Sequence, residues 1–199
     1  MVVVDVETSG LDPQKYAMLS IGAVDFENPK RQFYAECRAF EGAYFSDEAL
    51  AINGFTEEEA KDESRKPLEE VMAEFKEWLD PMDKITLAGQ NPSFDRDFVN
   101  ASFVRAKVNM RFASRTVDMH SLVYAAHLTR GIPLPRRNRH SDISLDSALV
   151  YTGIPEEPKP HNALTGAQVE AEAFSRIIHG KGLLSEFAHH PVPDYLLKK

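Results

Sequence analysis

The chain opens on an apolar, β-branched run, residues 1–7, in which Asp5 and Glu7 are the acidic positions. Such a run, closed by Ser-Gly and Asp-Pro pairs, predicts a buried strand that ends in a loop. Because side chains alternate across a strand, Asp5 and Glu7 are expected on the same face. Two carboxylates side by side at the end of a buried strand resist ionisation unless positive charge lies between them, and a pair of divalent cations with oxygen ligands would supply it.

The hydrophobic pattern further along predicts a mixed α/β chain. Residues 18–26 and 31–40 show strand patterning, and their short connections predict an antiparallel meander with the first strand. Residues 85–89 and 112–117 are predicted as two more short strands. The capping pattern of residues 56–59 marks a helix start. Helices are predicted over residues 46–52, 67–79, 95–107, 118–127, 143–151 and 163–178.

The 199 residues are predicted to form one domain. No internal repeat and no Gly/Ser-rich linker divides the chain, so we expect a domain over residues 1–180 and a C-terminal tail, 181–199, that packs on it. The 43% hydrophobic and 27% charged content is that of an ordinary globular protein. No apolar run is long enough for a transmembrane helix, and the N-terminus lacks signal-peptide features. The single cysteine, Cys37, cannot form an internal disulfide. We therefore expect a cytoplasmic protein without a membrane partner.

The net charge of −8 argues against a protein that coats nucleic acid by bulk electrostatics. The charge is uneven, however: residues 41–83 carry a net −10 and residues 104–140 a net +7. The acidic stretch is typical of solvated helix surfaces. The basic stretch includes Arg130, Arg136, Arg137, Arg139 and His140 around two prolines, and is interpreted as a phosphate-contacting flap, a solvated loop or a mobile segment, the first being favoured.

Three short patterns stand in order along the chain: Asp5-x-Glu7, then Asn91-Pro-Ser-Phe-Asp95, then His161-x-Ala163. Asp95 follows a predicted central strand at the start of a helix, where open α/β folds build their sites. Each pattern alone has an ordinary explanation, since Asp95 could stabilise the helix dipole and His161 could be a surface histidine. Together, in this order and at these spacings, they are specific.

In these patterns the sequence resembles the histidine-bearing branch of the DEDD 3′–5′ exonucleases, which reads Asp-x-Glu-Thr-Thr-Gly, then Phe-Asp, then His-x-Ala-x-x-Asp. The resemblance spans roughly residues 1–180 and includes residues 51–56 and 144–149. It implies an α/β fold, a ribonuclease H-like mixed sheet flanked by helices. It also implies hydrolysis of single-stranded DNA or RNA from the 3′ end with two divalent metal ions, Mg²⁺ or Mn²⁺, and release of nucleoside 5′-monophosphates.

Carried over residue by residue, the resemblance implies that Asp5, Glu7 and Asp95 bind metal and that His161 is the general base, with Glu7 also at the catalytic water. The loop after the first strand would contact the terminal nucleotide. The residues implied in substrate binding are Thr8, Leu11 and Asn91.

The third motif departs from the family, because Gly166 stands where the final metal-binding aspartate is expected. One explanation is a capping box of Thr165 and Gln168 that would make Gly166 the first helical residue. Another is a surrogate ligand, Glu170, one turn further on, although a turn displaces it by about 5 Å along the axis. On this basis we expect the second metal site to be weakened and hydrolysis in Mg²⁺ to be slow or absent. The alternatives are a degenerate exonuclease-fold module that binds 3′ ends without efficient turnover, and a glycine introduced into an active enzyme. The sequence indicates no oligomeric state.

Overall fold

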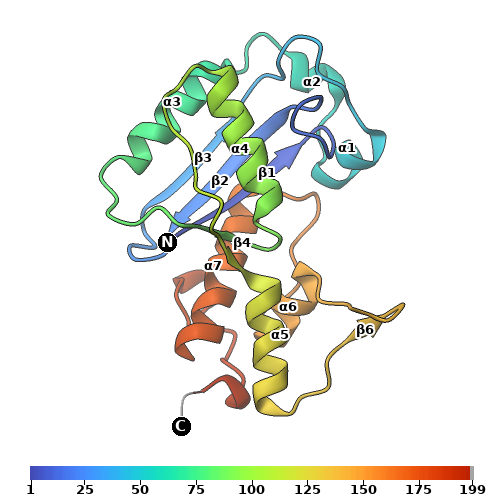
Figure 1. Cartoon of the computed structure of the whole chain (residues 1–199), viewed down its shortest axis with the longest axis vertical. Helices are drawn as coiled ribbons and strands as arrows, with labels where there is room; N and C mark the ends of the chain where they lie inside the picture. Colours follow the sequence, from blue (N-terminus) through green and yellow to red (C-terminus); the bar gives the residue numbers. More distant parts are fainter. Residues whose placement is uncertain (198–199) are drawn as a thin grey trace.

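The computed structural model describes residues 1–197 and is built around a five-stranded mixed sheet with the order β3-β2-β1-β4-β5 (Figure 1). The meander predicted for the first three strands is confirmed, because β2 pairs antiparallel with both β1 and β3. On the other side of β1, β4 and β5 run parallel to it. The strands are β1 (Val2–Thr8), β2 (Met18–Asp25), β3 (Gln32–Glu36), β4 (Leu87–Gly89) and β5 (Val117–Asp118).

Seven α-helices within the described residues accompany this sheet, so the predicted class, a ribonuclease H-like mixed sheet flanked by helices, is confirmed. They are α1 (Asp47–Asn53), α2 (Glu57–Lys61), α3 (Leu68–Leu79), α4 (Ser93–Arg105), α5 (Met119–Arg130), α6 (Leu145–Tyr151) and α7 (Ala163–His179). The prediction of a strand over residues 112–117 is wrong except at Val117, where β5 begins. The backbone of Phe112 pairs instead with the side chain of Asn100, which accepts from its N–H at 2.8 Å and donates to its carbonyl at 3.1 Å.

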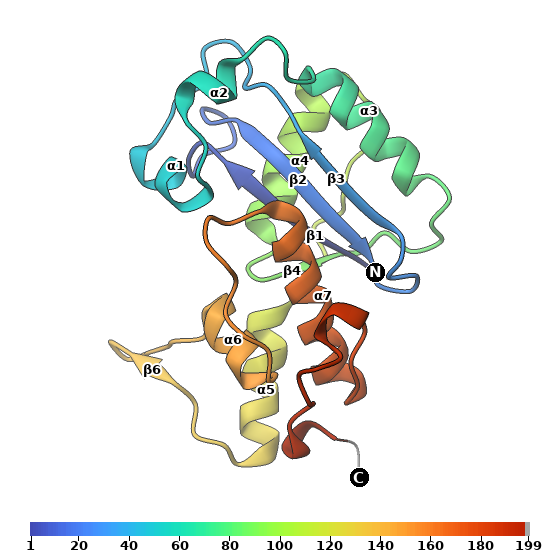
Figure 2. The same cartoon turned by 180° about the vertical axis from the view of Figure 1, so that it is seen from behind.

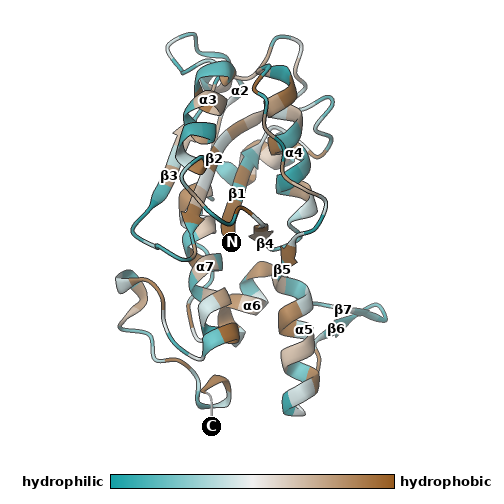
Figure 3. Ribbon diagram, turned by 60° about the vertical axis from the view of Figure 1, so that its left-hand side comes forward, coloured by the Kyte–Doolittle hydropathy of each residue, from teal (hydrophilic) through white to brown (hydrophobic). Residues whose placement is uncertain are grey.

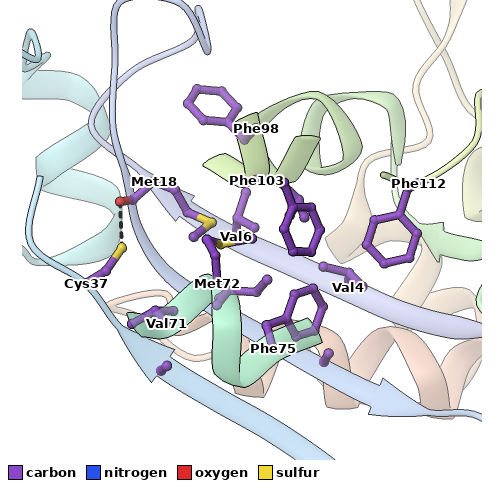
Figure 4. Close-up of a cluster of buried hydrophobic side chains, with 14 of the residues drawn as sticks. Val4, Val6, Met18, Cys37, Val71, Met72, Phe75, Phe98, Phe103 and Phe112 are labelled. Atoms are coloured by element: carbon purple, nitrogen blue, oxygen red, sulfur yellow. Dashed lines mark hydrogen bonds between the residues drawn. The ribbon is translucent and has the colours of Figure 1, made fainter. Parts of the chain in front are cut away.

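Two apolar cores lie on opposite faces of the sheet. Helices α3 and α4 cover one face, where Val4 and Val6 of β1 pack with Phe75 and Phe103 (Figure 4). On the other face α7 crosses β1 and β2 and continues towards α5 and α6, as Figures 1 and 2 show from opposite sides. In Figure 3 the strands are mostly hydrophobic, whereas the helices over them are hydrophilic on their outer sides. This arrangement follows from burial of apolar stripes between sheet and helices.

Helix α7 begins in close contact with the sheet. A β-carbon on Gly22 of β2 would lie 2.1 Å from the carbonyl oxygen of Ala163, so the glycine permits the approach. Asn162 caps the helix, since its Oδ1 accepts from the N–H groups of Leu164 and Thr165. The predicted capping box of Thr165 and Gln168 is therefore wrong, and Gly166 is not the first helical residue. The cap is set earlier, at Asn162, directly before Ala163, the residue that packs against Gly22 of β2.

The C-terminal segment folds back on α7. The buried side chain of Arg176 donates to the carbonyls of Phe187 and His190, while Glu172 accepts from the N–H groups of Leu183 and Leu184. Short 3-10 turns at Ser185–Phe187 and Asp194–Leu196 complete this segment. The last two residues of the predicted tail lie outside the described part of the chain.

Two hairpin strands, β6 (Arg136–Arg137) and β7 (His140–Ser141), project from the body between α5 and α6 (Figure 1). Throughout residues 1–197, every helix is too short or too polar to span a membrane.

Candidate active site

The predicted carboxylate pair lies at the carboxyl end of β1, on the face that α7 covers. Val4 and Val6 pack in the core under α3 and α4, whereas Val3 packs in the core under α7. Strand alternation therefore directs Asp5 and Glu7 towards α7. The strand ends in an irregularity between Glu7 and Thr8, where the register with β2 shifts. Such a bulge bends the strand and re-aims the side chains beside it.

Asp95 reaches the same place from α4. Strand β4 pairs with β1 only at Val2 and Val3, so the N–H of Val6 has no strand partner on that side. The Oδ1 atom of Asp95 accepts a hydrogen bond from this N–H at 3.1 Å. The end of β4 thus leaves a gap at the sheet edge, and the first turn of α4 inserts a carboxylate into it.

Glu170 also belongs to this cluster. Its side chain projects from α7, is only 3% exposed, and accepts a hydrogen bond from the backbone N–H of Gln90 at 3.0 Å through Oε1. Its second oxygen, Oε2, has no hydrogen-bond partner. A β-carbon on Gly89 would lie 3.2 Å from Oε2, so this oxygen rests against the end of β4.

His161 lies just before α7 and pairs with a second buried acid, Glu157. The Nδ1 atom of His161 is 3.6 Å from Oε2 of Glu157. The ligand atoms of Glu7, Glu157 and His161 all fall within 4.8 Å of one another. Sequence reasoning missed Glu157, since it stands in a proline-rich loop without a motif. Its only signal is the four-residue spacing before His161, which is weak outside a helix.

These groups surround one cavity of about 220 Å³. Its lining includes the carboxylates of Asp5, Glu7, Asp95, Glu157 and Glu170 and the imidazole of His161. The structure thus brings together every residue predicted as a metal ligand or general base. Gly166 faces Asp5, because a β-carbon there would lie 2.1 Å from the Oδ2 atom of Asp5.

Burial and mutual repulsion make these carboxylates hard to ionise. Burial, followed by the charges of Asp95 and Glu170, raises the pKa of Asp5 well above its ordinary value. Burial raises the pKa of Asp95 to about 7 despite hydrogen bonds from backbone N–H groups, and burial followed by Glu157 raises the pKa of Glu7 to about 7. The pKa of Glu170 is raised by burial and then by Asp95.

The cluster has little compensating positive charge. Within residues 1–197, no lysine or arginine forms an ion pair with any of its five carboxylates. The single basic partner in that range is His161, beside Glu157. Buried charges without such partners are costly, and hard divalent cations bind oxygen ligands of this kind. The unpaired oxygen of Glu170 and the all-carboxylate donor set therefore fit divalent cations.

The residues predicted to bind substrate lie around this cluster, in different settings. Asn91 lines the cavity and is exposed, with a φ of 52°. Leu11 is 81% exposed in the loop after β1. Thr8 is buried, and its hydroxyl donates to the carbonyl of Gly10 at 2.8 Å, so its side chain shapes the loop rather than facing solvent.

The predicted basic cluster is divided by the fold. Arg136, Arg137, Arg139 and His140 are exposed on the β6–β7 hairpin. The C-terminal end of the hairpin leads to Ile143, whose carbonyl accepts a hydrogen bond at 3.1 Å from Gln90, a residue of the cavity wall. Arg130 does not belong to this group: it lies at the end of α5 and donates to the carbonyl of Tyr195.

Comparison with known proteins agrees with this geometry. The family model described as Exonuclease matches residues 2–174. The chain is 32% identical over 180 residues to the 3′-5′ DNA exonuclease Cap18 of Escherichia coli, covering 88% of this chain and 90% of that protein. It is 31% identical over 207 residues to ribonuclease T of Marinobacter nauticus, covering 96% and 87%.

Solved structures share the fold at low sequence identity. The nuclease domain of 3'hExo, a DEDDh family member bound to rAMP, has a TM-score of 0.68 at 15% identity, covering 92% of this chain and 93% of that one. Exonuclease I of Escherichia coli in complex with an oligonucleotide also has a TM-score of 0.68, at 17% identity, covering 90% of this chain and 40% of that one. The chain therefore belongs to the exonuclease family, and it is a nuclease with the ribonuclease H-like fold whose motifs follow the histidine-bearing DEDD branch except at Gly166.

Proposed function

We propose that this protein hydrolyses the terminal phosphodiester bond at the 3′ end of single-stranded DNA or RNA and releases nucleoside 5′-monophosphates. The observation that carries the proposal is the convergence of five carboxylates, four of them buried and that of Asp5 half-buried, and of His161 on one cavity. The relatives named as a 3′-5′ DNA exonuclease and as ribonuclease T support the direction of attack and the class of substrate. A cytoplasmic location, expected from the single cysteine, is part of the proposal.

Asp5, Glu7 and Asp95 are the residues that would hold two divalent cations, Mg²⁺ or Mn²⁺. Such ions, when bound, stabilise the attacking and leaving oxygens of an in-line displacement. The protein's own contribution is a rigid set of oxygen atoms. Asp95 is held by the N–H of Val6, and Glu7 lies beside the bulge that ends β1.

His161 is suited to take the proton from the attacking water. Its side chain is 29% exposed at the cavity, whereas that of Glu157 is 3% exposed. With Nδ1 facing Glu157, the other ring nitrogen is free to accept a proton. An imidazole can accept a proton and release it again, which suits this role. Glu157 would hold the orientation of the ring and stabilise its protonated form.

The loop after β1 supplies the contacts proposed for the terminal nucleotide. Leu11 is exposed there and offers an apolar surface to the face of a base. Thr8 holds the loop through its bond to Gly10, and Asn91 offers a polar side chain from the cavity lining. Cavities with one apolar contact and a few polar groups commonly orient small ligands in this way.

The test uses single-stranded oligonucleotides that carry a fluorophore on the 5′ end. With Mg²⁺ or Mn²⁺ the full chain should shorten them stepwise from the 3′ end, and chromatography should identify nucleoside 5′-monophosphates as the product. EDTA should stop the reaction. His161→Gln should abolish shortening without loss of fold. Internal cuts would contradict an exonuclease, and tight binding of 3′ ends without any shortening in either metal would identify a degenerate binding module instead.

A further inference from the structure

Gly166 and Glu170 lie one helical turn apart on α7, and both face β1. The space that a side chain at position 166 would occupy is already filled, since a β-carbon there would lie 2.1 Å from Oδ2 and 2.8 Å from Cγ of Asp5. Real β-carbons do not approach other atoms so closely, and the interior is packed too densely to absorb the overlap without movement. A side chain at position 166 therefore requires the Asp5 carboxylate, which lines the cavity, to turn away from α7.

Glu170, in contrast, has a carboxylate that lines the cavity. One of its oxygens is held by the N–H of Gln90, while Oε2 is buried without a partner. A buried charged oxygen without a partner costs free energy unless a cation or a proton meets it. The displacement of one helical turn, which argues against Glu170 from the sequence alone, does not take this side chain out of the cluster, because it lines the cavity with Asp5 and Asp95.

The geometry points to an exchange of ligand positions: Glu170, rather than residue 166, supplies the fourth carboxylate of the metal site, and Gly166 leaves room for Asp5 to lean against α7. This inference rests on the proposed two-metal function. The count of ligands is then restored, with Asp5, Glu7 and Asp95 as the other three. The second metal site is not weakened in this arrangement, and the protein turns over as an ordinary nuclease.

Glu157 is the other candidate for the missing ligand, since its Oε1 is also buried without a partner, but it lies in the loop before α7 and not on the helix that carries Gly166. Its Oε2 faces Nδ1 of His161 at 3.6 Å, so it is engaged with the proposed base. A purely structural role for Glu170 is also a weaker explanation. The hydrogen bond from Gln90 uses one oxygen, and a neutral glutamine would provide it without the cost of a second carboxylate oxygen.

The experiment is a Mn²⁺ titration of the full chain at pH 8, with free Mn²⁺ followed by electron paramagnetic resonance. Two ions should bind to the unaltered protein. Glu170→Gln keeps an acceptor for the Gln90 N–H and removes the charge, so the second ion should bind at least tenfold more weakly. Gly166→Asp should add no ion. Without metal, the Tm of Glu170→Gln should equal or exceed that of the unaltered chain, which shows that the variant folds.

Glu172→Gln is the matched control, because Glu172 is equally buried on α7 but pairs with Arg176 at 2.6 Å. It should lower Tm and leave both Mn²⁺ ions in place. Two ions bound equally well by Glu170→Gln, with 3′ shortening by the unaltered chain, would overturn the inference and leave the proposed function standing. If the unaltered protein bound one Mn²⁺ ion and Gly166→Asp bound two, the inference would be overturned, and the fourth ligand would belong at position 166. No Mn²⁺ binding and no shortening by the unaltered chain would overturn both.

Discussion

The Oδ1 atom of Asp95 accepts a hydrogen bond of 3.1 Å from the N–H of Val6, which ties α4 to the edge of β1 where β4 has ended. The two oxygens of this side chain therefore have separate tasks, one structural and one open to a cation. Asp95→Asn keeps an acceptor for Val6 and removes the charge. We expect its exonuclease rate to fall at least a hundredfold, since activation by metal is worth several kcal/mol.

Asp95→Ala distinguishes the two tasks. It leaves the buried N–H of Val6 without a partner, at a cost of about 1–3 kcal/mol. Thermal melts in EDTA should give a lower Tm for Asp95→Ala and an unchanged or higher Tm for Asp95→Asn. Equal losses of stability in the two variants would show that the hydrogen bond to Val6 contributes nothing.

Gly166→Ala tests the close approach of Asp5 to α7. By helix propensity alone, alanine should stabilise α7 by about 1 kcal/mol. We expect the opposite, a loss of about 1–3 kcal/mol, because the new β-carbon overlaps the Asp5 carboxylate and overpacked sites cost that much. Denaturant melts of the metal-free protein would measure it.

The Asp5→Ala background is the control for this substitution. Once the carboxylate is absent, the overlap disappears and Gly166→Ala should become neutral or stabilising. The difference between the two backgrounds is the coupling energy of the pair. A stabilising effect in both would mean that the Asp5 side chain moves away without cost.

The first strand and its carboxylate pair were predictable because two periodic signals coincide there. An apolar β-branched run defines the strand, and alternation alone places Asp5 and Glu7 on one face. The site of Asp95 was predictable for a similar reason, since a carboxylate in the first turn after a central strand reaches the carboxyl edge of the sheet.

Glu157 and the environment of Glu170 depend on tertiary contacts that no local pattern encodes. Glu157 reaches His161 through an irregular loop. Whether Glu170 meets the cluster depends on where α7 crosses the sheet, and Gly22 determines that by allowing contact with Ala163. The start of α7 could not be chosen from sequence either, because Asn162 and Thr165 are both good capping residues and only the packing selects Asn162.

Metal-free protein should lose stability as pH rises. The folded-state pKa values of Glu7 and Asp95 are raised to about 7, above their ordinary values of 4.5 and 3.8. Between these ordinary values and about pH 7, the folded state therefore binds more protons than the unfolded state. Their contribution is fully present below about pH 4 and is lost as pH rises through about 7. A difference of one pKa unit is worth about 1.4 kcal/mol, so the Tm in EDTA should fall by several degrees between pH 5 and pH 8.

Saturating Mn²⁺ should remove most of that fall, because the cation replaces the protons as the partner of the carboxylates and binds only the folded state. Differential scanning calorimetry over this pH range, with and without metal, gives the comparison. A Tm in EDTA that rises from pH 5 to pH 8 would contradict this pH dependence.

Glu157→Gln tests the orientation of His161. Loss of the carboxylate facing Nδ1 removes the partner that fixes the direction of the ring. We expect kcat to fall by about one to two orders of magnitude, with KM and Mn²⁺ stoichiometry unchanged. If Glu157 were a metal ligand, Mn²⁺ binding would weaken as well, so the titration separates the two roles.

The β6–β7 hairpin is expected to contact the substrate backbone upstream of the 3′ end. Its arginines are exposed, and its C-terminal end is anchored beside the cavity by the bonds of Ser141 to His120 and of Ile143 to Gln90. Arg136→Gln combined with Arg139→Gln removes two positive charges without touching the cavity wall. The KM for a 15-nucleotide substrate should rise roughly tenfold at 0.1 M salt, with kcat unchanged, because phosphate contacts supply affinity rather than chemistry.

Salt dependence separates a contact from a general change in charge. Each phosphate contact to a single strand contributes a slope of about −0.7 to log K against log salt, so the double variant should flatten the slope by about 1.4. Arg130→Gln, which removes a charge at the far end of α5, roughly 18 Å along the helix from its start, is the matched control and should leave KM and slope unchanged. If Arg130→Gln raised KM in proportion to its one charge, binding would depend on the overall field of the protein and the hairpin would have no special role.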